Sequence, residues 1–146
     1  MAQELNQFRM TAEKGQLTLD QNWATLNAQV STNEAGTLAH GQAVLIEDAA
    51  GAQIPVIKAT AADDAIFGFV TYNVRTDAYV AEENVKIAKR GDVMRMEASA
   101  AIARGASVEV VIAGNKVATQ TTGTVVGTAL DKAAADGDLI RVLIEV

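Results

Sequence analysis

The sequence predicts an all-β fold, a compact β-barrel or sandwich-like domain built from two similar β units. Short runs of alternating apolar and polar residues, spaced about ten residues apart, are typical of strands. Turn sequences that contain glycine separate these runs. Segments of the first half also recur, in the same order, in the second: residues 38–46 match 102–110, 67–70 match 126–129, and 91–96 match 137–142.

Residues 1–36 differ from the rest and are predicted to form an N-terminal arm, rich in Gln, Asn and Thr. Residues 24–30 alternate as in a half-buried strand, yet the apolar residues from Leu19 to Val30 also fall on one helical face. Both interpretations remain open, with a slight preference for an extended arm. Because such a polar segment buries little apolar surface alone, it must lie on its own domain or on a neighbour.

Residues 37–146 are predicted to form the β domain, with a first unit over residues 38–97 and a second over residues 102–146. Pro55 cannot donate a ladder hydrogen bond, so its strand should lie at an edge or begin late. The strands expected in the first unit cover residues 42–47, 53–59, 66–74, 85–87 and 93–96.

In the second unit, Ala-Gly-Asn at residues 113–115 predicts a short hairpin turn. The Ala-rich residues 59–65 and 129–135 favour a helix by propensity, but both segments are short and lie between strands. They are therefore expected to form loops or single helical turns. The strands expected in this unit cover residues 108–112, 116–118, 124–130 and 139–146.

Composition argues against several classes of protein. The net charge is −6, and the 12 Lys and Arg residues are scattered singly, which disfavours nucleic-acid binding. No apolar run approaches the roughly 20 residues of a membrane-spanning helix, and the N-terminus lacks the pattern of a secretory signal. With no cysteine, the chain has neither a disulfide framework nor a thiolate metal site.

No residue pattern predicts catalysis, a metal or a cofactor. His40 is the single histidine, and its repeat counterpart is Arg104, which indicates a solvated loop position. The run 123–127 lacks the lysine of a phosphate-binding loop, so Gly127 is expected to serve tight packing within a strand. Calcium binding is disfavoured at the acidic pairs 63–64 and 136–138, because a calcium site needs six to eight ligands. Residues 136–138 match residues 90–92, where a base replaces the first acid, so they are expected to form a turn.

The arm supplies the candidate interface. Trp23, the sole tryptophan, lies in this polar segment and either caps the core of its own domain or anchors the arm to a partner. The residues predicted to form the interface are Phe8, Met10, Leu17, Leu19, Trp23 and Leu26.

The second half has the order of motifs of a known family. A Gly-containing strand start, a Gly-Xaa-Ala-Leu strand, an Ala-rich linker and a terminal Gly-Asp-Leu-Ile-Arg-Val-Leu occur at residues 102–108, 126–130, 132–135 and 137–143. In this respect the chain resembles the structural cement, or capsid decoration, proteins of tailed bacteriophages. The likeness covers about residues 36–146, and the arm and an extra hairpin near residues 71–90 depart from it.

The resemblance implies a virion protein made in the host cytoplasm that binds the outer surface of an assembled icosahedral head. It implies the major capsid protein as partner, self-association as a homotrimer, and no active site. Two other functions remain. The first is a head-fibre base or a module that recognises a cell surface or a carbohydrate, but the sequence has few aromatic residues for sugar stacking. The second is a trimeric β-barrel enzyme such as a nucleotide hydrolase, which would need clustered Asp, Ser, Tyr and Arg motifs that this sequence lacks.

Overall fold

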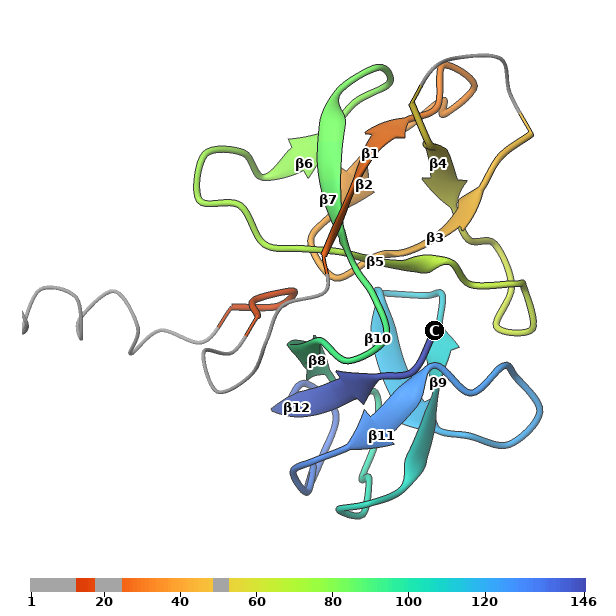
Figure 1. Ribbon diagram of the computed structural model, residues 1–146. Helices are drawn as coiled ribbons and strands as arrows, with labels where there is room; N and C mark the ends of the chain where they lie inside the picture. The colour runs from red at the N-terminus through yellow and green to blue at the C-terminus, as the bar shows by residue number, and fades with distance from the viewer. Residues whose placement is uncertain (1–12, 18–24, 49–52) are drawn as a thin grey trace, which may run out of the picture.

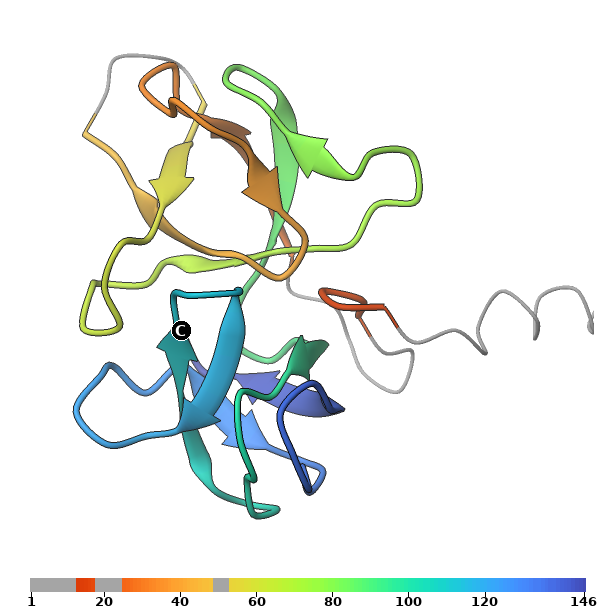
Figure 2. The same ribbon diagram turned by 180° about the vertical axis from the view of Figure 1, so that it is seen from behind.

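The computed structural model describes residues 13–17, 25–48 and 53–146. Figure 1 shows two lobes of β-structure stacked on each other, the first containing β1 to β7 and the second β8 to β12. The same two lobes are seen from behind in Figure 2. The described residues form strands, turns and loops without a helix, so the all-β prediction is confirmed.

The first lobe is a closed barrel with the strand order β1-β4-β3-β5-β7. Strand β1 closes it, because β1 pairs antiparallel with β7 on one side and parallel with β4 on the other. Strands β2 and β6 form a separate two-stranded ladder. The strands are β1 (Leu26–Val30), β2 (Leu38–Ala39), β3 (Ala43–Ile46), β4 (Pro55–Lys58), β5 (Gly68–Val70), β6 (Ala78–Tyr79) and β7 (Asn84–Ala88).

The second lobe is a five-stranded sheet with the order β10-β9-β11-β12-β8. A single parallel bridge between Ala98 and Val117 joins its two outer strands, as β1 joins β4 in the first lobe. The strands are β8 (Val93–Glu97), β9 (Ser107–Val111), β10 (Lys116–Thr119), β11 (Gly127–Ala129) and β12 (Leu139–Ile144).

The two lobes repeat one another down to single backbone hydrogen bonds. Ahead of the hairpin, the Gly41 amide donates to the Val70 carbonyl, and the Gly105 amide donates to the Ala129 carbonyl in the same way. Both glycines have a positive φ, 78° and 85°, which a residue with a side chain rarely adopts. The glycines at these turns therefore allow the backbone conformation that both lobes share.

Where β1 and β7 meet, the Glu82 amide donates to the Val30 carbonyl. In the second lobe the Gly137 amide donates to the Ala98 carbonyl. Glu82 and Gly137 both have a positive φ, 72° and 92°. These equivalences make β8 the counterpart of β1, and β12 the counterpart of β7.

This correspondence corrects the predicted repeat boundaries of residues 38–97 and 102–146. Strand β8 belongs to the second lobe, where it pairs with β12 in the register Met94 to Val142. The match between residues 91–96 and 137–142 thus relates neighbouring strands of one sheet. Both segments begin with a Gly-Asp turn whose carboxylate accepts a hydrogen bond from the amide three residues earlier, and this shared turn explains their likeness.

The predicted arm boundary at residue 36 also needs correction, because β1 is an integral strand of the first barrel. Of the two interpretations of residues 24–30, the strand is correct over Leu26–Val30. Its inward residues, Ala28 and Val30, are buried, whereas Asn27 is exposed. The polar residues on the outward face of β1 explain why the sequence predicts a solvated arm here.

The other nine strand predictions are confirmed, but five of the strands are shorter than predicted, β5 and β11 most of all. Strands β5 and β11 cover three residues each, because the chain leaves the sheet directly after them. Strand β4 begins at Pro55, as the late-start alternative predicts, but it is not an edge strand, since β1 and β3 flank it. The Ala-rich residues 59–65 and 129–135 form turns and loops, with Ala129 closing β11.

The lobes share one hydrophobic core. Its main cluster joins Phe69 and Ala88 of the first lobe to Met94, Ile140 and other residues of the second. A smaller cluster, with Leu38 and Ile87, fills the first barrel. Because one cluster crosses the boundary between the lobes, we expect them to fold as a unit.

Candidate interaction surfaces

The structure describes two of the six predicted interface residues. Leu17 is half-buried, forms an antiparallel bridge with Met94 and packs against the shared core, so it faces inward. Leu26, the first residue of β1, is 38% exposed. The other four, Phe8, Met10, Leu19 and Trp23, lie outside the described residues.

Residues 13–17, here called the strap, connect the two lobes. The Gly15 amide donates to the Arg95 carbonyl, and the Arg95 amide donates to the Gln16 carbonyl, both at 2.8 Å. On the other side, the Tyr72 amide donates to the Gly15 carbonyl at 2.9 Å. The strap thus pairs with the outer strand β8 of the second lobe and also holds the loop that follows β5 in the first.

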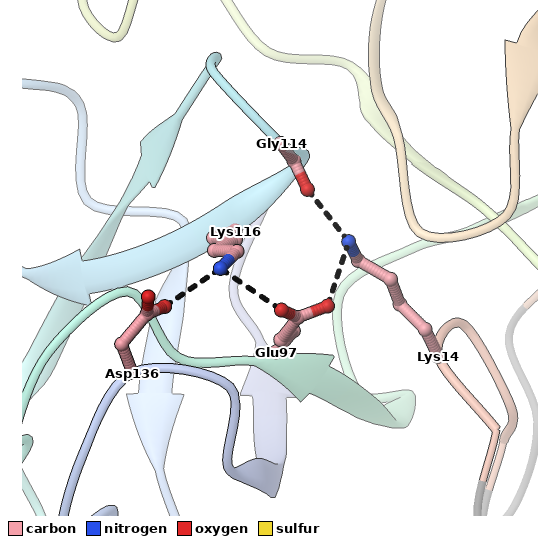
Figure 3. Close-up of polar contacts among 5 residues, drawn as sticks. All are labelled: Lys14, Glu97, Gly114, Lys116 and Asp136. Carbon is pink, nitrogen blue, oxygen red and sulfur yellow. Dashed lines mark hydrogen bonds and ion pairs between the residues drawn. The ribbon is translucent and has the colours of Figure 1, made fainter.

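A chain of charged groups fixes the strap to the second lobe (Figure 3). The Lys14 ammonium lies 3.4 Å from Glu97 and donates to the Gly114 carbonyl at 2.8 Å. Lys116 bridges Glu97 at 3.0 Å and Asp136 at 2.6 Å. The hydrogen bond from Lys116 lowers the pKa of Glu97, and that to Asp136 raises the pKa of Lys116. Because these groups are partly exposed, we expect them to orient the strap more than to stabilise the fold.

The strap should be most sensitive to substitution at Gly15. Its φ is +79°, and an added Cβ would lie 2.8 Å from the Gly41 nitrogen. We expect Gly15→Ala to cost about 1 to 2 kcal/mol and to loosen the strap. Hydrogen exchange would then be faster at the Gly15, Tyr72 and Arg95 amides.

Lys14→Ala is the matched control for this change, since it removes exposed charge pairs and leaves the backbone ladder in place. Its expected cost is below about 1 kcal/mol. Exchange rates in Gly15→Ala equal to those of the parent would show that the strap does not depend on this glycine.

A groove opens on the outer face of the first barrel, here called the amide groove. It has a volume of about 390 Å³, and its lining includes Asn27, Tyr72, Asn73, Tyr79, Asn84 and Lys86. Outward residues of β1 and β7 form one wall, because Asn27 pairs with Lys86 in the ladder. The loop after β5 supplies the other wall.

His40 lies behind this second wall. Its ring meets Tyr72 edge-on at 4.9 Å and Tyr79 at 6.4 Å, and its Nε2 accepts a hydrogen bond from the Asn73 amide at 3.4 Å. The predicted solvated position is therefore corrected to a half-buried one that supports the two tyrosines. The extended loop around Tyr72, which the second lobe lacks, provides these partners.

At the equivalent place the second lobe has an ion pair. The Thr71 amide donates to the Lys86 carbonyl, and the Leu130 amide donates to the Arg141 carbonyl, so Arg141 corresponds to Lys86. The Arg141 guanidinium binds both carboxylate oxygens of Asp131, at 2.9 and 2.8 Å. The amide groove is therefore an addition to the duplicated scaffold.

The same ion pair predicts an acid-sensitive step. The hydrogen bond from Arg141 lowers the pKa of Asp131 from 3.8 to about 2. Because the folded-state pKa is the lower one, ionised Asp131 stabilises the fold above pH 3.8, and this contribution is lost as the pH falls to about 2.

We expect Asp131→Asn to cost about 1 kcal/mol or less at neutral pH and to reduce this acid dependence, measured by urea unfolding. In an Arg141→Met background the same change should have a smaller effect, because only the Arg141 backbone amide and the charge of Arg104 then favour the ionised carboxylate. Equal acid dependence of parent and Asp131→Asn would contradict the assignment to this residue.

The acidic pairs close turns. The Asp64 carboxylate accepts hydrogen bonds from the Thr60 and Ala61 amides, both at 2.9 Å, and these lower its pKa. Asp138 accepts from the Ala134 and Ala135 amides at 2.7 and 3.1 Å. Across the described ranges, no group of three or more His, Cys, Asp or Glu side chains could hold a metal ion. The same ranges contain no helix long and apolar enough to cross a membrane.

Residues 2–145 match the family of structural cement proteins described by E217 gp24 and Pam3 gp6. The chain belongs to this phage structural cement family. The family match confirms the resemblance seen in the sequence and makes this chain a structural protein of the virion that stabilises it.

Among solved structures, this cement protein is similar to the N base of the head fibre gp8.5 of bacteriophage phi29. The two share 12% sequence identity with a TM-score of 0.53, over 85% of this chain and 95% of that one. At this identity the likeness shows the fold alone. No curated protein matches the chain.

The two lobes of the cement protein differ in charge. Residues 25–88 contain eight acidic and three basic residues, whereas residues 89–146 contain seven of each. Nearly all of the net charge of −6 therefore belongs to the first lobe. Two of its acids, Glu34 and Glu47, are held by hydrogen bonds from Gly36 and Asn33, which fixes their charge in place.

Proposed function

We propose that this cement protein binds the outside of the assembled icosahedral head, contacts the major capsid protein there and acts as a homotrimer. The observation that carries the proposal is the family match over residues 2–145, nearly the whole chain. The role needs rigid contact area and no chemistry. The shared core across two duplicated lobes provides this rigidity.

The charge distribution supports an electrostatic part in head binding. An acidic first lobe is attracted to a basic patch on a shell, and this attraction increases the rate of association with the shell. The same charge repels nucleic acid. Many copies on one head, or three in one trimer, convert modest single contacts into firm attachment. Binding should accordingly weaken as salt concentration rises.

The test is to incubate purified protein with undecorated heads and to pellet the heads. We expect saturable co-sedimentation, weak binding to free coat subunits, and heads that withstand higher temperature when decorated. A protein that stays in the supernatant at micromolar concentration would overturn the proposal. Electron microscopy of the pelleted heads would show whether the density lies on the outer surface.

The homotrimer is tested separately by light scattering. We expect a mass three times that of the 15.3 kDa chain, either in solution or after release from heads. A monomeric mass in both states would contradict the homotrimer but not the proposal that the protein binds heads. The proposal includes no catalysis, and metal-dependent hydrolysis of nucleotides by the pure protein would contradict this part.

A further inference from the structure

We infer that the amide groove of the first lobe is a binding site for a neutral oligosaccharide. The groove belongs to the first lobe alone, whereas every feature that the shared fold requires should occur in both lobes. In the second lobe the equivalent positions hold the Asp131–Arg141 pair. In the first lobe they hold Tyr72 and Lys86, beside a longer loop that forms the second wall.

The lining is suited to hydroxyl groups. The amides of Asn27 and Asn84 are exposed on adjacent strands, with Asn73 opposite them on the loop. Each side-chain amide can both donate and accept hydrogen bonds, and so can a sugar hydroxyl. The Tyr72 ring adds an amphipathic surface against which the apolar face of a sugar can pack. His40 supports this ring from behind at 4.9 Å.

Other ligand classes fit this lining less well. An extended peptide cannot add as a strand, because β1 and β7 each have strand neighbours on both sides in the closed barrel. A peptide anchored by an apolar side chain would need an apolar pocket, but the apolar aliphatic residue in the lining, Val85, is only 3% exposed. Among the described residues that line this groove, Lys86 alone is charged, and one charge is too little to select an anionic ligand.

The test uses ¹⁵N-labelled full-length protein titrated with three neutral hexasaccharides, those of maltose, cellulose and chitin type, and with a heparin hexasaccharide. We expect at least one neutral sugar to bind with a Kd of roughly 0.1 to 1 mM and to shift the side-chain amide signals of Asn27 and Asn84. Asn84→Ala should weaken that binding about tenfold.

Asn84 points outward from β7, so Asn84→Ala should fold normally; Tyr72→Ala tests the ring separately. Gln53→Ala, an exposed amide outside the groove lining, is the matched control and should bind like the parent. We expect Asn84→Ala to co-sediment with heads as the parent does. A loss of sugar binding with normal head binding would therefore separate this proposal from the cement role. Absence of shifts with every neutral sugar at about ten times the upper Kd, shifts elsewhere on the protein, or binding of heparin alone would overturn the inference.

Discussion

Replacing Phe69 with alanine should lower the free energy of unfolding by about 3 to 5 kcal/mol, the largest effect expected of a single substitution in this protein. Phe69 lies on β5, is 1% exposed and is the aromatic member of the cluster that joins the lobes. Its neighbours there are aliphatic side chains on strands held by ladder hydrogen bonds, so they cannot collapse into the space left by the ring.

The measurement is urea unfolding followed by circular dichroism, with Val74→Ala as the control. Val74 is 81% exposed, and its truncation should change the free energy by less than about 0.5 kcal/mol. If Phe69→Ala were as stable as this control, the shared core would not be what holds the lobes together.

The shared core also determines how the parent protein unfolds. A cluster containing residues of both lobes, reinforced by the strap, couples the stability of each lobe to that of the other. We therefore expect one cooperative transition in the parent. A lobe that unfolded first would show that the contacts across the boundary are too weak to couple them.

The duplication could be recognised from the sequence because its turns constrain the backbone. Gly41 and Gly105 both need a positive φ and close the same hydrogen bond, so the same residue type appears at both places. The predicted repeat boundaries were wrong because two turns of the same kind precede neighbouring strands. Gly91 and Gly137 have φ values of 98° and 92° and each precedes a strand, but the two strands are not repeat equivalents.

The strap and the amide groove could not be predicted from the sequence. The strap is held mainly by main-chain hydrogen bonds, and these leave no side-chain pattern in the sequence. The groove brings Asn27 and Asn84 together only through the pairing of β1 with β7, which closes the barrel. Such a long-range pairing follows from tertiary packing rather than from local preference.

A second large effect is expected at the two equivalent strand glycines, Gly68 in β5 and Gly127 in β11. A Cβ at Gly127 would lie 2.4 Å from the Leu143 carbonyl oxygen, and one at Gly68 would lie 2.5 Å from the Ala88 carbonyl oxygen. Both obstacles are backbone atoms of the paired strand, β12 or β7, which cannot move without breaking the ladder. The sequence-based expectation of tight packing at Gly127 is thereby confirmed.

We expect Gly127→Ala and Gly68→Ala each to lower the free energy of unfolding by about 3 kcal/mol, because overpacking against a fixed backbone cannot be relieved by a side-chain rotation. Gly36→Ala is the matched control, since its nearest neighbour would be a Glu34 carboxylate oxygen at an ordinary 3.7 Å. The same urea titration should show that control unchanged within about 0.5 kcal/mol. Because the two strand glycines occupy the same place in each lobe, similar losses at both would mean that the duplicated scaffold imposes the requirement, whereas a loss at one alone would assign it to that lobe's own packing.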